Sequence, residues 1–118
     1  MENKIDGLRL RIKNYVLEGL VYARKIPYDK ISRSIIDQFV RALTSIGANF
    51  QEATEASSDR DVFYKLSISK KEAGEVKYWL GLIVILYPII NTEGLILISK
   101  TEEIIKIIAS IMKVKSPH

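Results

Sequence analysis

The sequence predicts an all-α protein, an antiparallel up-down-up-down four-helix bundle that forms one domain over residues 1–118. Two observations support this fold class. Apolar residues recur every three or four positions along most of the chain, which places them on one face of a helix. Proline and short polar residues interrupt this pattern, and short connections make long helices antiparallel neighbours. The predicted helices are residues 4–26, 31–56, 59–87 and 92–113.

The second and third predicted helices have the most regular patterns, with steps that alternate between three and four. The second helix has the series Ile36, Phe39, Leu43, Ile46, Phe50 and Ala53. The third helix has the series Val62, Leu66, Ser69, Ala73, Val76, Leu80 and Ile83. Between them, residues 57–59 are short polar side chains that favour turns and helix N-caps. We therefore expect these two helices to form a hairpin against which the rest of the chain packs.

The first predicted helix carries apolar residues at helical spacing from Ile5 to Ile26. Arg24 and Lys25 lie in its last turn, where cations stabilise the negative end of the helix dipole. Pro27 ends this helix, because the residue before a proline is pushed out of the α region.

The remaining helix ends follow from capping residues and proline. The cap of the second helix is expected within residues 29–34, and Pro88 ends the third helix. Asn91 or Thr92 is predicted to cap the fourth helix. The apolar stripe of that helix is predicted to be Ile98, Ile105, Ile108 and Met112.

The net charge of +4 belongs entirely to the first half of the chain. Residues 1–50 carry nine basic and five acidic side chains, whereas residues 51–118 carry nine of each. This asymmetry is typical of an electrostatic footprint for an anionic partner such as nucleic acid. The simpler interpretation is that helix surfaces are usually charged. The candidate nucleic-acid-binding residues are Arg9, Arg11, Lys13, Arg24, Lys25, Lys30, Arg33 and Arg41.

The third helix carries more apolar side chains than one intramolecular seam covers. Trp79, Leu82 and Leu86 cannot all lie on the same side as Ile83. Surplus apolar surface on a small helical domain favours self-association, and we expect a homo-oligomer. The alternative is that this helix is simply central in the bundle.

Polar residues on the flanks of the hairpin are expected to fix the register between its two helices. Antiparallel packing brings Asn49 toward Lys65 and Glu72, so that the amide could hydrogen-bond either side chain. The candidate oligomer and register residues are Asn49, Glu52, Lys65, Glu72, Tyr78, Trp79, Leu82 and Leu86.

Residues for catalysis or metal binding are sparse. The chain has no cysteine, and its single histidine, His118, lies in the tail. Di-iron bundles use Glu-x-x-His motifs, but the glutamate pairs here are Glu52 with Glu55 and Glu72 with Glu75. A hairpin would offset these pairs by roughly 10 Å, which is too far to share one metal. We expect a non-enzymatic protein without a cofactor or metal.

The uncharged run of residues 78–92 raises the question of a membrane. A spanning helix needs about 20 apolar residues, and this run contains Pro88 and Asn91. The charged N-terminal residues lack the apolar core of a signal peptide. We expect a cytoplasmic protein without a membrane partner.

Parts of the second and third helices resemble a known family. Residues 45–53 read Ser-Ile-Gly-Ala-Asn-Phe-Gln-Glu-Ala. This run is similar to the Ser-Ile-x-x-Asn-x-x-Glu-Gly/Ala segment of four-helix-bundle proteins encoded in intervening sequences of bacterial 23S ribosomal RNA genes, the S23 family. Residues 61–66 and 71–80 resemble the third helix of that family, in the branch with a Tyr-Trp-Leu ending.

The resemblance implies an up-down bundle that assembles as a ring, commonly a pentamer, with no known catalysis. Related bundles are accessory proteins of diversity-generating retroelements, where they hold a reverse transcriptase and its RNA. Two hypotheses follow from this. The first is a ring that binds RNA, and the second is a protein-interaction scaffold for a partner such as a reverse transcriptase.

Overall fold

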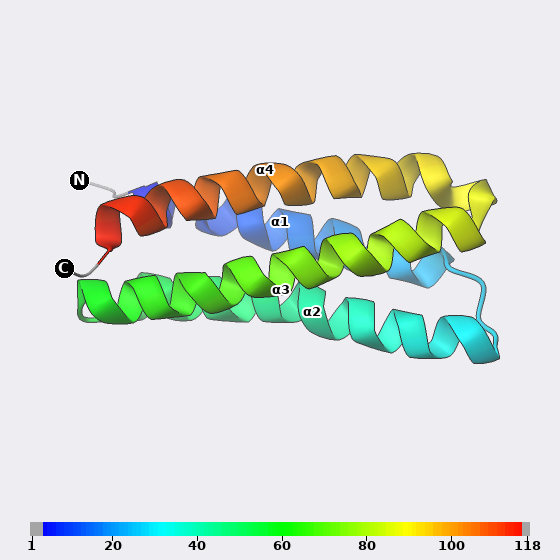
Figure 1. Cartoon of the computed structure of the whole chain (residues 1–118), viewed down its shortest axis with the longest axis horizontal. Helices are drawn as coiled ribbons and strands as arrows, with labels where there is room; N and C mark the ends of the chain where they lie inside the picture. The colour runs from blue at the N-terminus through cyan, green and yellow to red at the C-terminus, as the bar shows by residue number, and fades with distance from the viewer. Residues whose placement is uncertain (1–3, 117–118) are drawn as a thin grey trace.

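The computed structural model describes residues 4–116, and the side chains of all of these except Lys4 and Asp6. Neighbouring helices run in opposite directions, so α1 begins and α4 ends at the same end of a rod of 46 × 22 × 19 Å (Figure 1). The predicted all-α bundle is confirmed, and each predicted helix end lies within two residues of the observed one. The elements are α1 (Lys4–Lys25), α2 (Lys30–Glu55), α3 (Asp59–Leu86), the short 3-10 helix η1 (Pro88–Ile90) and α4 (Asn91–Lys115).

Side-chain caps begin α2 and α3. The Asp29 carboxylate accepts hydrogen bonds from the backbone N–H groups of Ile31 and Ser32, at 2.9 and 2.8 Å. The Ser32 hydroxyl in turn accepts a hydrogen bond of 2.7 Å from the Asp29 N–H, which completes a capping box. Ser58 caps α3 by accepting a hydrogen bond of 3.1 Å from the Asp61 N–H. Both caps lie within the predicted ranges.

The start of α4 differs from the prediction. Neither Asn91 nor Thr92 caps it, because Ile90 occupies the cap position and makes no side-chain capping bond. The helix η1 leads directly into α4, and the Asn91 N–H donates to the carbonyl of Pro88. This 3-10 turn satisfies one of the backbone N–H groups that have no partner within α4.

The buried stripe of α4 is also shifted from the predicted one. Among the predicted residues only Ile108 is buried, whereas Ile98, Ile105 and Met112 are half-buried. The observed stripe lies on the adjacent side of the helix. It consists of Gly94, Leu97, Thr101, Ile104, Ile108 and Ile111.

The α2–α3 hairpin forms the centre of the core, as predicted. Every residue of the α3 series is buried, and in the α2 series only Ile36 is half-buried. Inside the hairpin, the Ser69 hydroxyl donates a hydrogen bond of 2.9 Å to the carbonyl of Ile46. This bond satisfies a buried polar side chain at a position that otherwise holds apolar residues.

The first helix packs less extensively than the other three. Contacts of α3 with α2 and α4 are extensive, those of α1 with α2 are fewer, and those of α1 with α4 are fewest. Both α1 and α3 pack between α2 and α4, so they occupy diagonal corners of the bundle. At Gly19, α1 and α2 approach so closely that an added Cβ would collide with the side chain of Leu43.

The uncharged run of residues 78–92 crosses the turn between α3 and α4. Pro88 begins η1 inside this run. Within residues 4–116 no single helix combines the length and apolar composition needed to cross a membrane. The pair formed by α3 and the segment Pro88–Lys115 meets both criteria together, across a bend of 119°.

Candidate interaction surfaces

Three ion pairs bridge α1 and α4. The α1 members lie seven residues apart, so they project from the same side of the helix. Their charges alternate along α1, and each faces the opposite charge on α4. The pairs are Arg11 with Glu103, Glu18 with Lys100 at 2.7 Å, and Lys25 with Glu93 at 2.7 Å.

Two buried tyrosines of α1 lie on the bundle side of these ion pairs. The hydroxyl groups of Tyr15 and Thr101 lie 2.5 Å apart, and Thr101 donates its own proton to the carbonyl of Leu97 at 2.7 Å. Tyr15 is therefore the donor to Thr101. Burial raises the pKa of Tyr15 to about 12. Burial, together with the carboxylate of Glu93, raises the pKa of Tyr22 to about 12, so both phenols stay neutral.

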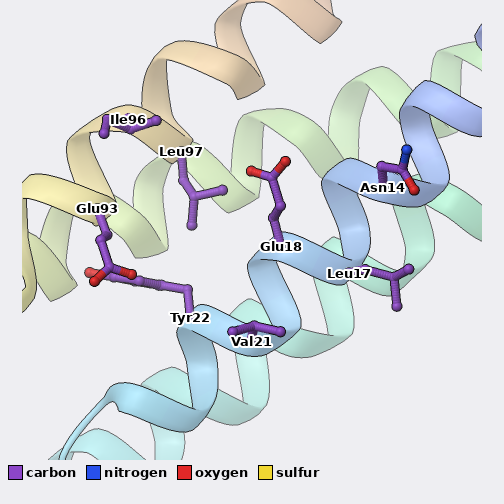
Figure 2. A pocket seen from close by; sticks show the side chains of 8 residues that line it. All are labelled: Asn14, Leu17, Glu18, Val21, Tyr22, Glu93, Ile96 and Leu97. Carbon is purple, nitrogen blue, oxygen red and sulfur yellow. The ribbon is translucent and has the colours of Figure 1, made fainter.

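A groove of about 570 Å³ runs along the outside of the α1–α4 seam. In Figure 2, Glu18 and Tyr22 reach from α1 toward α4, and Glu93 projects from α4 on the side of Tyr22. The Tyr22 hydroxyl donates a hydrogen bond of 3.1 Å to the carbonyl of Ile90. Both carboxylates of the groove are bound in ion pairs, so they are not a free acid–base couple. The remaining lining residues are Asn14, Leu17, Val21, Ile96 and Leu97.

The eight predicted cations fall into two groups. Arg11 and Lys25 are neutralised by the carboxylates of α4, and Arg9 donates a hydrogen bond of 3.0 Å to the hydroxyl of Thr54 on α2. The others are exposed and form no ion pair with any side chain that the structure describes. These uncompensated cations are Lys13, Arg24, Lys30, Arg33 and Arg41.

A second groove, of about 380 Å³, runs between α1 and α2. Arg9 and Lys13 line it from α1, and Thr44 and Gln51 line it from α2. The other six lining residues are apolar or glycine, so the cations and the Gln51 amide are the groups of this groove that can donate to phosphate and sugar oxygens. We call this groove, together with the five uncompensated cations, the α1–α2 basic face.

The register residues behave only partly as predicted. Glu52 and Lys65, both among the predicted register residues, form an ion pair of 3.0 Å across the hairpin. The prediction that Asn49 bonds Lys65 or Glu72 is wrong, because its amide donates to the carbonyl and hydroxyl of Ser45 one turn earlier in α2. Asn side chains often bond nearby backbone groups in this way.

The predicted apolar oligomer residues differ in exposure. Tyr78 and Leu86 are exposed, whereas Trp79 and Leu82 are half-buried. The indole Nε1–H of Trp79 is buried and makes no hydrogen bond with the residues described, which costs about 1–3 kcal/mol when no partner is found. Close by in the sequence, partial burial and the neighbouring Glu75 carboxylate raise the pKa of Glu72.

The family profile of the 23S rRNA-intervening sequence proteins matches residues 13–110. The chain belongs to this family. A crystal structure of a protein with unknown function from the S23 ribosomal protein family of Bacteroides thetaiotaomicron is similar, with 29% sequence identity and a TM-score of 0.83. The match covers 94% of this chain and 99% of that chain. Comparison with curated proteins gives no match.

Membership of the 23S rRNA-intervening sequence family confirms the resemblance that the sequence carries in residues 45–53, 61–66 and 71–80. The matched region begins at Lys13 and therefore includes most of the α1–α2 basic face. The relation to retroelement accessory proteins stays a prediction.

The buried hydroxyl groups of the α1–α4 seam have no counterpart among the residues predicted to be functional. Tyr15, Tyr22 and Thr101 are all buried, although their spacing is that of ordinary core positions. A polar residue at a core position of a helix, such as Thr101, is a usable signal for a buried hydrogen bond. Within the described part of the chain, no cluster of three His, Asp or Glu side chains is placed to hold a metal ion.

Proposed function

We propose that this protein is a non-enzymatic, cytoplasmic homo-oligomer, a ring of the pentameric kind, that binds RNA through the α1–α2 basic face. The observation that carries the proposal is the division of the cations. Arg11 and Lys25 are balanced by α4, whereas Lys13, Arg24 and Arg33 stand exposed without an acidic partner among the side chains that the structure describes. Membership of a family associated with 23S rRNA intervening sequences supports RNA as the anion.

Assembly would compensate for the modest charge of one chain. A single copy carries +4, and five copies carry about +20, which makes counterion release from RNA a substantial driving force. The hydroxyl and amide groups of Thr44 and Gln51 lie in the groove beside Arg9 and Lys13. The Gln51 amide can donate to sugar and phosphate oxygens, whereas the Thr44 hydroxyl, whose proton goes to the carbonyl of Val40, can accept from a sugar hydroxyl. Such contacts position the RNA without reading its sequence.

Binding of a structured RNA, measured by fluorescence anisotropy over a salt series, tests the proposal. Replacement of Lys13 and Arg24 by glutamine should weaken binding and lower the slope of log K against log salt by about 1.5. The matched control replaces Arg11 and Lys25 by glutamine, which removes the same charge from the same helix at ion-paired positions. The control should retain most of the slope. Equal weakening by both variants, or no binding by the wild type, contradicts the proposal.

A second candidate function, a protein-interaction scaffold, is favoured by one further surface. The end of the rod opposite the start of α1 is formed by the α1–α2 loop, the start of α2, the end of α3 and η1 (Figure 1). Each of these segments carries an exposed apolar side chain, and Ile89 among them is 91% exposed. This apolar tip consists of Tyr28, Ile31, Ile85 and Ile89.

A scaffold function would place a reverse transcriptase of the diversity-generating kind on this tip. Co-purification with a reverse transcriptase encoded beside the gene tests it. Ile89→Ser should then abolish capture, whereas Val114→Ser, at a position near the other end of the rod that is 78% exposed, should not. Absence of such a neighbouring gene counts against this function.

A further inference from the structure

The solvent side of α3 has its own three-four repeat, separate from the buried series. Large side chains alternate there with small ones, and members of each kind lie seven residues apart. Tyr64, Tyr78 and Ile85 are each more than half exposed. We call this series the α3 outer stripe. It consists of Tyr64, Ser67, Lys71, Gly74, Tyr78, Gly81 and Ile85.

The two glycines of the α3 outer stripe have no explanation within one chain. A Cβ added at Gly74 or Gly81 would meet nothing within 4 Å. By contrast, a Cβ at Gly94 would collide with Val84 and Tyr22, so that glycine is needed for packing. Glycine in a helix costs about 1 kcal/mol relative to alanine. Gly74 and Gly81 carry this cost without an intramolecular contact that requires it.

A complementary series lies on the solvent side of α1. Leu10, Leu17 and Val21 are each more than half exposed, although they are large aliphatic residues. Their spacing, with Gly7 and Asn14 at the intermediate positions, again alternates between three and four. A single Asn within an apolar seam of this kind specifies the register of paired helices. We call this series, Gly7 to Val21, the α1 outer stripe.

The two stripes fit each other better than either fits itself. Large aliphatic side chains project from the α1 stripe, whereas the α3 stripe offers small residues between large ones, the arrangement that knobs-into-holes packing needs. Because α1 and α3 occupy diagonal corners of the bundle, the stripes face away from each other and cannot meet within one chain. A contact between copies is therefore heterologous, and such contacts close into rings when the rotation between subunits allows it.

The dimensions of the rod also favour a lengthwise contact. A long side of 46 × 22 Å offers about 1000 Å², whereas a stable interface buries about 800 Å² on each partner. An end of the rod, 22 × 19 Å, offers only about 400 Å². We propose that the α1 outer stripe of one copy packs against the α3 outer stripe of the next. This inference rests on the proposed assembly and names its interface.

The mass of the protein in solution tests this interface. Gly74→Gln replaces a glycine by a good helix former in open space, so the single chain should fold at least as stably as the wild type. At the interface the new side chain fills a hole, and the variant should fall from a multiple of 13.4 kDa to 13.4 kDa in light scattering. The control is Ser99→Gln on the exposed side of α4, which should keep the wild-type mass. A thermal melt followed by circular dichroism checks that both variants fold.

Disulfide crosslinking distinguishes the α1–α3 contact from a contact of like helices. The chain has no cysteine, so single-cysteine variants at positions 10, 17 and 21 of α1 and 64, 71 and 78 of α3 crosslink only where they are placed. Mild oxidation of an α1 variant mixed with an α3 variant should give covalent dimers in at least one combination. Crosslinking within the α1 variants alone, with none in the mixtures, overturns the inference.

The same variants separate this inference from the proposed function. A wild type that is monomeric at high concentration overturns both the interface and the ring. An assembled wild type whose mass Gly74→Gln leaves unchanged overturns the interface alone, whatever its RNA binding. An assembled wild type that Gly74→Gln dissociates, but that binds no RNA, supports the interface and overturns the RNA-binding function.

Discussion

Thr101 has a central part in the α1–α4 seam because its hydroxyl satisfies two buried groups at once. It accepts the proton of Tyr15 and donates its own to the carbonyl of Leu97. The two partners depend on it unequally. The carbonyl of Leu97 lies within α4, so it can also accept the helical hydrogen bond from a backbone N–H. The Tyr15 hydroxyl has no other partner among the bonds that the described residues form.

Thr101→Val should therefore destabilise the protein more than Tyr15→Phe. The valine has nearly the same shape but leaves the buried Tyr15 hydroxyl without an acceptor, at a cost of about 1–3 kcal/mol. Tyr15→Phe removes the donor and leaves the Thr101–Leu97 bond intact, so its cost should stay near or below about 1 kcal/mol. Urea unfolding of both variants and of the double variant gives the coupling energy. Equal costs for the two single variants contradict this account.

The capping box of α2 predicts a dependence of stability on pH. The backbone N–H of Ser32 is the main cause that lowers the pKa of Asp29 below its ordinary 3.8. Because the folded-state pKa is the lower one, the ionised cap stabilises the fold fully above the ordinary value and loses this effect as the pH falls through the folded pKa. The stability difference between the wild type and Asp29→Ala should thus narrow below pH 3.8.

The α3 cap supplies the control for this titration. Ser58→Ala removes a hydroxyl that does not titrate, and should cost about 1 kcal/mol at every pH. Thermal midpoints between pH 2 and 7 test both variants. A difference for Asp29→Ala that stays constant over this range contradicts the role assigned to the Asp29 charge.

At the scale of the elements, Gly94 marks the place where α4 passes close to α1 and α3. Gly94→Ala puts a methyl group against Val84 and Tyr22, and overpacking of this kind costs about 1–3 kcal/mol. The matched control, Ser99→Ala, lies on the exposed side of the same helix and should change stability by less than about 0.5 kcal/mol. Denaturant unfolding measures the stability of both variants. A Gly94→Ala variant as stable as the wild type would mean that Val84 and Tyr22 shift to accommodate the methyl group at little cost.

The same elements show how far local pattern predicts the fold. In α2 the apolar residues alternate with polar ones, so the phase of the helix is unambiguous, and every residue of the predicted series except Ile36 is buried. In α3 the alternation holds as far as Lys77, and beyond it nearly every residue is apolar, but the series set by the first half continues in phase and is buried throughout. In α4 isoleucine occurs on every side, at positions 104, 105, 107, 108 and 111, so the pattern predicts a helix but not which side faces the core. Tertiary packing settles that choice, and the sequence prediction was one position off.

The candidate site was predictable to a similar extent. The excess of cations on the first half of the chain is readable from composition, and five of the eight chosen residues are uncompensated. Arg11 and Lys25 were also predicted to bind nucleic acid, because the sequence does not show that they are paired. Their partners, Glu103 and Glu93, lie more than 60 residues away in the sequence. No local pattern reveals such a pair, since it depends on how α1 and α4 meet.

For the whole molecule, assembly and stability should be coupled. If the α1 and α3 outer stripes meet between copies, folding includes association, and mass action makes the thermal midpoint rise with protein concentration. Gly74→Gln should abolish this rise, and Ser99→Gln should keep it. Differential scanning calorimetry over a hundredfold range of concentration measures the effect. A wild-type midpoint that does not depend on concentration would mean that single chains are the stable unit.

The charged bridges between α1 and α4 have one more consequence. Helices held by apolar interdigitation separate only when the core opens, but α1 meets α4 over a small contact whose outer layer consists of ion pairs. Salt screens such pairs. Exposed pairs of this kind contribute about 0–1 kcal/mol each, and the buried residues of α1 pack against the core in addition. Ionic strength should therefore change modestly how readily the first helix separates from α4, and a neighbouring copy that covers α1 would hold it in place.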